Sequence, residues 1–363
     1  LQKRSQVLGE ITRQFRTIAI AGTHGKTTTT TLVTHILKTA GINCFAFLGG
    51  ISQNYKTNLL LGDASDPDAF VVVEADEYDR SFLTLTPYIT VITSVDADHL
   101  DIYGTAEDML ATYTQFAGQV KEEGFLIVKK TVDNDLTLNR ERLIYSLNLG
   151  TEYCAANIHI REGEFCYDII SPVEAVNRVA IGLPGLHNVE NSIAATAVAQ
   201  QLGIKGDVIN TALRSFKGVK RRFDYHVKTP SLVYIDDYAH HPEELKAAIG
   251  SAKQLYPDKK VTGIFQPHLF SRTRDFADGF AESLDLLDEC ILLEIYPARE
   301  KPIEGIDSQM LLSKMKLKNK HLVPKEQVID FLKTHPVEVL MTLGAGDIDG
   351  LIEPIEKLLR ERS

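Results

Sequence analysis

Cysteine is scarce in this chain of 363 residues, and its four copies stand far apart. Cys44, Cys154, Cys166 and Cys290 show neither the close pairs of a metal site nor the spacing of a disulfide framework. Such a pattern excludes a small disulfide-stabilised scaffold and favours a reducing compartment. We therefore expect a cytoplasmic protein.

Long apolar runs are also missing. No stretch approaches the ~20 apolar residues of a membrane-spanning helix, and we expect no signal peptide. Basic residues are outnumbered, with 39 Lys and Arg against 49 Asp and Glu, which leaves a net charge of −10. This balance argues against nucleic acid or an anionic membrane as the main partner. We expect small-molecule partners, and no pattern indicates a protein partner.

The chain is longer than one usual hydrophobic core requires, so two domains are expected. Strands alternate with helices along most of it, which predicts α/β domains built on parallel sheets. Residues 151–182 differ, because short alternating strands around Gly163 indicate an antiparallel patch. We place the boundary near 217–223, giving domains 1–220 and 221–363. The start at Leu1, with a helix-like lead-in, leads us to expect a missing preceding part.

Individual elements follow from the spacing of apolar residues and from glycine and proline breaks. In the first domain we predict helices at 2–15, 27–40, 105–119, 189–202 and 206–215, and strands at 18–21, 43–47, 70–73, 89–93, 124–129 and 142–146. In the second we predict strands at 231–236, 260–265, 289–294 and 337–343, and helices at 242–255, 271–286, 307–316, 325–333 and 347–361.

A glycine-bounded turn follows the first apolar run and reads Gly22, Thr23, His24, Gly25, Lys26, Thr27, Thr28. Strand, turn and helix in this order predict a phosphate loop, with Lys26 on the β- and γ-phosphates and the Thr27 hydroxyl on Mg²⁺. Ile20 stands where the general pattern has its first glycine. The alternative is a plain glycine turn before an amphipathic helix.

Acidic residues follow two further buried-type strands. Glu74 comes directly after one, as a second metal-holding carboxylate would, although it can also be a solvated acidic turn. His99 follows the next, between Asp98 and Asp101. Either it ligates a second cation or it is a paired surface imidazole. Because carboxyl ends of parallel strands share one edge, we expect these groups to lie near the phosphate loop.

Polar residues also gather at later strand and helix ends. Asn188 and Asn191 open an apolar helix, where they either cap it or bind a base. Arg222 stands at the domain boundary and either clamps phosphate or is simply solvated. Around the next two strand ends lie Asp237, Tyr238, His240, His268 and Arg272. These indicate a substrate or nucleotide site rather than a zinc site, since no further ligands stand at suitable spacing.

Taken in order, these motifs resemble those of the Mur ligase family. They are Ala21–Thr29, Glu74–Glu77, Asp98-His99, Gly185–Asn191, Arg221–Phe223 and Asp236–Pro242, and the resemblance covers essentially the whole chain. It implies a central ATPase domain (1–220) and a C-terminal Rossmann-like domain (221–363), without the family's N-terminal UDP-binding domain. His24 and the segment Ile295–Glu300 favour the member that joins L-alanine to UDP-N-acetylmuramate in peptidoglycan precursor synthesis.

The resemblance also implies a mechanism and roles. The muramoyl carboxylate would receive the γ-phosphoryl group of ATP, and the amine of L-alanine would attack the resulting acyl phosphate. Two Mg²⁺ ions are expected, one held by Thr27 and Glu74 and the other by His99. By the same resemblance, ATP would be bound through its phosphates by Lys26 and Arg222. Its adenine would contact Asn188 and Asn191, and its ribose would contact Asp237. The acyl group and amino acid would meet Tyr238, His240, His268 and Arg272.

Two departures from family patterns bear on the substrate. Leu269 stands where many members have an arginine, which puts one substrate contact in doubt. The segment Thr112–Gln115 holds no lysine, so we expect no carbamylated lysine. Two alternatives stay open: a recycling ligase that joins a whole tripeptide to the same nucleotide sugar, and a nucleotide-binding module without ligase activity.

Overall fold

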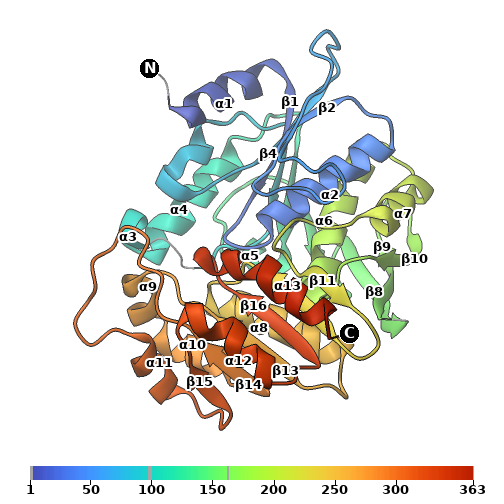
Figure 1. Ribbon diagram of the computed structural model, residues 1–363. Coiled ribbons are helices and arrows are strands. Elements are labelled where there is room, and N and C mark those ends of the chain that lie inside the picture. The colour runs from blue at the N-terminus through green and yellow to red at the C-terminus, as the bar shows by residue number, and fades with distance from the viewer. Residues whose placement is uncertain (1–2, 97–99, 162, 363) are drawn as a thin grey trace. The chain divides into compact units, whose positions relative to one another are not determined.

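The computed structural model describes residues 3–96, 100–161 and 163–362. It divides into two compact units, Leu1–Lys220 and Arg221–Ser363, each built on its own sheet (Figure 1). The four cysteines are free thiols. Within the described ranges, we find no helix with both the length and the apolar character needed to cross a membrane.

The first unit contains a ten-stranded sheet whose central strands are parallel. In spatial order the strands are β10 (Val176–Ile181), β9 (Glu164–Ile170), β8 (Tyr153–Arg161), β7 (Leu143–Ser146), β6 (Phe125–Lys129), β5 (Ile89–Ile92), β1 (Arg16–Ala21), β4 (Phe70–Glu74), β2 (Cys44–Phe47) and β3 (Leu59–Leu60). The antiparallel pairs β8–β9 and β9–β10 form the patch predicted at 151–182.

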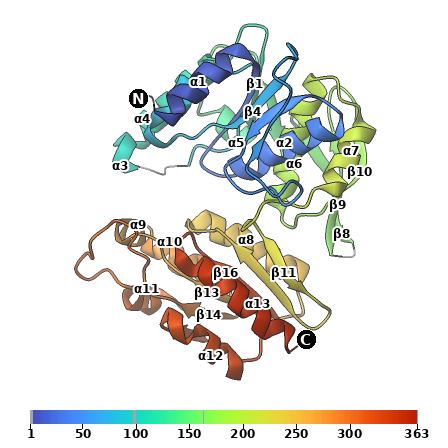
Figure 2. The same cartoon turned by 45° about the horizontal axis from the view of Figure 1, so that its top comes forward.

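Helices cover both faces of this sheet (Figure 2). They are α1 (Arg4–Gln14), α2 (Lys26–Thr39), η1 (Tyr78–Thr84), α3 (Leu100–Tyr103), α4 (Ala106–Gly118), α5 (Lys130–Asp133), α6 (Leu186–Gln201) and α7 (Gly206–Ser215). On one face, Phe82, Tyr113 and Phe116 pack in a buried cluster with the strands. On the other, α2 packs against α6 and α7. The sheet is therefore the middle layer of three.

Helix α2 forms although five consecutive threonines, which have modest helix propensity, follow its first residue Lys26. Two of the five hydroxyls bond within the helix: Thr30 donates to the carbonyl of Lys26 at 2.8 Å, and Thr31 donates to that of Thr27 at 2.7 Å. Thr29, Thr30 and Thr31 are fully buried. Small β-branched side chains thus fill the space under the sheet beside the phosphate loop.

The second unit contains a six-stranded, mostly parallel sheet. Its strands in spatial order are β11 (Asp224–Lys228), β12 (Val233–Asp237), β16 (Val339–Leu343), β13 (Val261–Phe265), β14 (Glu289–Leu292) and β15 (Lys320–Leu322). Its helices are α8 (Pro242–Leu255), α9 (Phe270–Asp275), α10 (Ala277–Leu284), α11 (Ser308–Lys314), η2 (Lys325–Gln327), α12 (Val328–Thr334), η3 (Asp347–Leu351) and α13 (Ile352–Arg360).

Two buried clusters, one on each face of this sheet, confirm the doubly wound arrangement. Helices α8, α10 and α11 contribute to one cluster, and α12, η3 and α13 contribute to the other. Strands β12, β13 and β16 are buried along their whole length, as the continuous apolar runs predicted. The carboxyl ends of these parallel strands share one edge of the sheet.

Several predicted elements differ in detail. The helix predicted at 271–286 is interrupted at Phe276, whose φ of −114° and ψ of 17° are not helical. The Phe276 ring is held against His241, with centroids 4.7 Å apart. Helix α6 begins at Leu186, earlier than predicted. Strands β3, β11 and β15 were not predicted from the sequence; each stands at an edge of its sheet, and β3 and β15 have only two and three residues.

Candidate functional site

The turn after β1 requires its glycines. Gly22 has a φ of +136°, and a Cβ there would lie 2.1 Å from Thr93 Oγ1 at the end of β5. Gly25 has a φ of +81° and precedes α2, whose N-terminus carries no side-chain cap in the described structure. Backbone N–H groups of the first helical turn thus remain for an anion, supported by the helix dipole.

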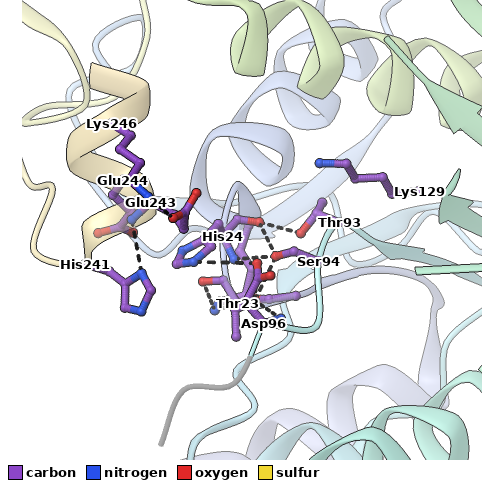
Figure 3. A network of polar contacts seen from close by, with 12 residues as sticks. Thr23, His24, Thr93, Ser94, Asp96, Lys129, His241, Glu243, Glu244 and Lys246 are labelled. Carbon is purple, nitrogen blue, oxygen red and sulfur yellow. Dashed lines mark hydrogen bonds and ion pairs between the residues drawn. The ribbon is translucent and has the colours of Figure 1, made fainter. Parts of the chain in front are cut away.

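The turn is anchored to the end of β5 by hydroxyl groups (Figure 3). The His24 N–H donates to Ser94 Oγ at 2.8 Å, and Thr93 Oγ1 donates to the His24 carbonyl at 2.5 Å. Thr23 Oγ1 lies 2.9 Å from Ser94 Oγ and accepts from the Asp96 N–H at 2.9 Å. These contacts hold the loop backbone open in one conformation, which preorganises an anion site.

Lys26 lies inside this loop. Its Nζ donates to the carbonyl of Gly22 at 2.6 Å and lies 2.8 Å from each carboxylate oxygen of Glu77. The two side chains are only 13% and 3% exposed. The predicted phosphate-binding ammonium is therefore present at the loop, but a carboxylate that the sequence analysis quoted without a role already pairs with it.

Glu74 and Thr27 lie around one pair of glycines. Glu74 ends β4, next to β1, in register with Ile20. A Cβ on Gly49 would lie 2.0 Å from Glu74 Oε2, and a Cβ on Gly50 would lie 3.2 Å from Thr27 Cγ2. The structure thus places the carboxylate and the threonine against adjacent residues. Both offer the hard oxygen ligands that Mg²⁺ prefers.

The opening of α6 also reaches the phosphate loop. A Cβ on Gly25 would lie 2.8 Å from Asn191 Oδ1, so this amide packs against the loop backbone. Asn188 Nδ2 donates to the Pro184 carbonyl at 2.7 Å, and Asn191 Nδ2 donates to Asn188 Oδ1 at 3.3 Å. Both asparagines are buried, so they shape the α6 end of the site rather than an exposed helix cap.

In the second unit, Asp237 holds a strained segment. Arg221 and Phe223 have φ values of +63° and +48°, which non-glycine residues seldom adopt. Asp237 Oδ2 accepts from the Phe223 N–H at 2.7 Å, and Oδ1 accepts from the Ala239 N–H at 2.8 Å. Burial raises the pKa of Asp237 to about 7, while Arg222 and these N–H groups oppose the rise. The carboxylate thereby positions the segment that carries Arg222.

The neighbouring aspartate makes a buried ion pair. Asp236 is fully buried; its Oδ2 lies 3.0 Å from Arg221 Nε, and its Oδ1 accepts from Thr342 Oγ1 at 2.7 Å. Arg221 Nη2 also donates to the Gly344 carbonyl at 2.7 Å. Burial raises the pKa of Asp236, and Arg221 counteracts that effect. Arg221 thus connects the start of the second unit to the end of β12, through Asp236, and to the residue that follows β16, Gly344.

Aromatic and imidazole rings line the same edge. The guanidinium groups of Arg221 and Arg222 lie over the Tyr238 ring, 5.1 and 5.2 Å from its centroid. The Tyr238 and His240 centroids are 5.2 Å apart, and His240 lies 6.4 Å from His268. The structure therefore brings Arg222, Tyr238, His240 and His268 together, although 46 positions separate the first from the last.

The electrostatic setting of the two histidines favours their neutral forms. Burial is the main cause that lowers the pKa of His240 to about 4, with Glu244 opposing it and Arg272 adding to it. His240 Nδ1 lies 3.0 Å from the Tyr238 carbonyl and 3.2 Å from Glu244 Oε2. Burial and then Arg272 lower the pKa of His268. Neutral imidazoles can accept protons or hydrogen bonds from a substrate amine.

Tyr296, to which the sequence alone assigned no role at the site, completes this edge. Its ring stacks on His268 with centroids 5.8 Å apart, and its carbonyl accepts from the Leu269 N–H at 2.9 Å. Leu269 has a φ of +69° and directly precedes α9, which carries Arg272. The residue in place of the family's arginine therefore lies in a strained turn beside the predicted substrate residues.

One predicted ligand cannot be placed. His99 lies outside the described residues, as does Asp98. Among the described residues, Glu77, Thr93 and Ser94 contact the loop although no role was predicted for them from the sequence. Glu77 stands three positions after Glu74 in an acidic cluster, and this pattern could have identified it as a site residue. No sequence pattern marks Thr93 or Ser94 as site residues.

Two family profiles match the chain, one described as "Mur ligase middle domain" over residues 20–199 and one as "Mur ligase, glutamate ligase domain" over residues 221–346. The UDP-N-acetylmuramate–L-alanine ligase of Parabacteroides distasonis is 47% identical over 361 residues, which are 99% of this chain and 78% of that protein. The chain belongs to the Mur ligase family. The resemblance stated from the motifs is thus confirmed.

Solved Mur ligases share the fold. The crystal structure of UDP-N-acetylmuramate–alanine ligase MurC from Thermotoga maritima matches with a TM-score of 0.82 at 25% identity, covering 99% of this chain and 79% of that one. A murein peptide ligase from Psychrobacter arcticus matches with a TM-score of 0.70 at 23% identity, covering 98% and 80%. The predicted α/β fold class is confirmed by both.

Proposed function

We propose that this Mur ligase joins L-alanine to UDP-N-acetylmuramate in an ATP-dependent reaction that forms an amide bond. The observation that carries the proposal is the 47% identity to a ligase of that name over 99% of the chain. The phosphate loop with Lys26, backed by Glu74 and Thr27, supports the use of ATP. The two units supply distinct sets of polar residues, one suited to a triphosphate and one to a carboxylate and an amine.

Activation is required because a free carboxylate is a poor electrophile. A carboxylate oxygen of the muramoyl group attacks the γ-phosphorus of ATP, the bond to the β-phosphate oxygen breaks, and ADP leaves. The alanine amine then attacks the carbonyl carbon of the acyl phosphate. The tetrahedral species expels inorganic phosphate, and the nitrogen loses its extra protons to solvent or to a base. The amide, ADP and phosphate are the products.

Residues of the first unit hold the triphosphate. The ammonium of Lys26 and the uncapped N-terminus of α2 oppose its negative charge, and Ser94 and Thr93 keep the loop in shape. Asn188 and Asn191, at the start of α6, are proposed to contact adenine. Because Lys26 pairs with Glu77, a bound phosphate must share the ammonium with this carboxylate or replace it.

Magnesium is proposed as the metal. The Thr27 hydroxyl and the Glu74 carboxylate fit it, because both are hard oxygen donors and both lie against the Gly49–Gly50 turn. Bound there, Mg²⁺ would offset charge between the phosphates and the incoming carboxylate. His99 is proposed for the second ion.

In the second unit, Tyr238, His240, His268 and Arg272 are proposed to position the acyl group and L-alanine. Arg222 is proposed for the phosphates, since its guanidinium is held over Tyr238 and lies 3.7 Å from Glu244 Oε1. Asp237 is proposed for the ribose, although both of its oxygens already accept backbone N–H groups. An additional hydrogen bond would use a remaining lone pair.

The test is ADP release by the natural full-length protein given UDP-N-acetylmuramate with L-alanine or, separately, with a murein tripeptide. We expect alanine-dependent turnover, abolished in Lys26→Ala and retained in a surface control, Lys130→Ala. Lys130 is half exposed and pairs only with Asp133 in the described structure. Turnover with tripeptide alone would instead identify the recycling ligase, and ATP binding without amine-dependent turnover would identify a nucleotide-binding module.

A further inference from the structure

Two histidines and a glutamate converge at the second sheet, apart from the residues assigned above. Glu289 begins β14, His321 lies on β15, and His335 follows the last turn of α12. Tyr296 and His268 follow the carboxyl ends of β14 and β13, whereas Glu289 is at the amino end of β14. The cluster thus lies toward the opposite end of the strand from the proposed substrate residues.

The spacing of the three side chains suits one small cation. His321 Nε2 lies 3.0 Å from Glu289 Oε1, and His335 Nε2 lies 3.9 Å from the same oxygen. One ligand atom from each residue lies within 4.8 Å of the others. Ligands at about 2.0–2.1 Å from a tetrahedral zinc ion stand roughly 3.3 Å apart, so small side-chain adjustments would suffice.

The surroundings restrain the ligands. Phe331 stacks on the His335 ring with centroids 4.1 Å apart and lies 5.1 Å from the His321 ring. Thr262 Oγ1 lies 3.4 Å from the second oxygen of Glu289 and can orient the carboxylate. The side chains of Glu289, His321 and His335 are 19%, 36% and 39% exposed, so an ion can enter and keep a water as fourth ligand.

The Nδ1 atom of His335 adds a second observation. It is buried and has no hydrogen-bond partner among the described residues. The Nε2 atom of the same ring lies toward Glu289 Oε1, so it is the nitrogen that a cation in this cluster would meet. The stack on Phe331 restrains the orientation of the ring.

We propose that Glu289, His321 and His335 form a binding site for one divalent ion of the zinc class. Two imidazoles and one carboxylate form a borderline-soft set that suits Zn²⁺ or Co²⁺, whereas Mg²⁺ prefers oxygen ligands alone. The ion joins the edge strand β15 to β14 and to the end of α12. Its role is therefore structural, and it is independent of the proposed magnesium site.

The experiment titrates metal-stripped protein with Co²⁺ alone, without nucleotide, and follows visible d–d absorption. We expect one equivalent with a tetrahedral spectrum that Zn²⁺ displaces, and a rise in the thermal midpoint on adding Zn²⁺. His321→Gln and His335→Gln should each weaken Co²⁺ binding at least about tenfold. Lys26→Ala should leave it unchanged, which separates this site from the nucleotide site.

The matched control is His159→Gln, because His159 is an exposed histidine of the first unit, whose Nδ1 lies 2.7 Å from the Asn157 carbonyl. Thermal melting in EDTA establishes that each variant folds. Equal melting in EDTA combined with loss of the zinc-induced shift in His335→Gln supports the site. Wild-type Co²⁺ affinity in both His321→Gln and His335→Gln, or absence of the tetrahedral spectrum, overturns it.

Discussion

The ammonium of Lys26 lies 2.8 Å from both carboxylate oxygens of Glu77. Glu77 is 2% exposed, and the Tyr103 hydroxyl donates to its backbone carbonyl at 2.5 Å, so the backbone that carries the carboxylate is held in place. An arriving phosphate must share Lys26 with this carboxylate or replace it. The pairing keeps a partly buried cation satisfied in the free protein and weakens its attraction for anions.

Glu77→Gln should therefore tighten nucleotide binding. Removing the competing charge should lower the Kd for ATP without metal by roughly threefold to tenfold, about 1 kcal/mol. Equilibrium dialysis or calorimetry measures the change, and high salt should diminish it. Asp79→Asn is the control, because Asp79 is exposed and pairs with Lys3. Weaker ATP binding in Glu77→Gln would show instead that Glu77 contributes to phosphate binding.

Gly49→Ala should impair magnesium use. The new Cβ would lie 2.0 Å from Glu74 Oε2, so the carboxylate must move away from its position. We expect the Mg²⁺ concentration for half-maximal ADP release to rise roughly tenfold, the effect typical of a disturbed ligand environment. Gly118→Ala is the control, because the nearest atom to its Cβ is Leu138 Cδ1 at 3.8 Å. An unchanged Mg²⁺ dependence in Gly49→Ala would remove Glu74 from the metal site.

His240 should make stability depend on pH. Its pKa is lowered to about 4 in the folded protein, so between pH 4 and 6.5 the unfolded chain binds more protons. Stability is therefore full above pH 6.5 and falls as pH drops toward 4, by up to about 3 kcal/mol.

Chemical denaturation of wild type and His240→Asn at pH 7.5 and pH 5 measures this effect. The variant should lose less stability than wild type over this interval, because it lacks the titrating imidazole. Histidine ring resonances followed by NMR give the pKa of His240 directly. A His240 resonance that titrates near pH 6.5 would contradict the assignment.

Arg221→Met should destabilise the second unit. The change leaves the fully buried Asp236 carboxylate with the Thr342 hydroxyl as its hydrogen-bond partner among the described residues, and it removes the bond to the Gly344 carbonyl. Breaking a buried ion pair from one side costs about 3–5 kcal/mol. Urea denaturation of the second unit measures the loss.

Two further variants make this test specific. Arg221→Met combined with Asp236→Leu should recover part of the stability, because no buried charge is then left unpaired. Arg222→Met should have a small effect, since its partner Glu244 is 3.7 Å away and Arg222 is 31% exposed. Equal losses in Arg221→Met and Arg222→Met would contradict a buried pair.

Local patterns decided much of what the sequence analysis predicted. Continuous apolar runs such as Phe70–Val73 imply buried parallel strands, and Gly25-Lys26-Thr27 after a strand implies an anion-binding turn. Both depend on neighbouring residues only, so they are readable without coordinates. The phosphate loop, the two α/β alternations and the family follow from such short-range signals.

Only the tertiary structure decided which distant groups meet. The contacts of Ser94 with Thr23, of Glu77 with Lys26 and of Glu74 with Gly49 depend on the pairing of β1 with β5 and β4. The cluster of Glu289, His321 and His335 depends on β15 adding to the sheet edge. No local periodicity encodes these pairs, because strand register and helix docking are set by packing over the whole unit.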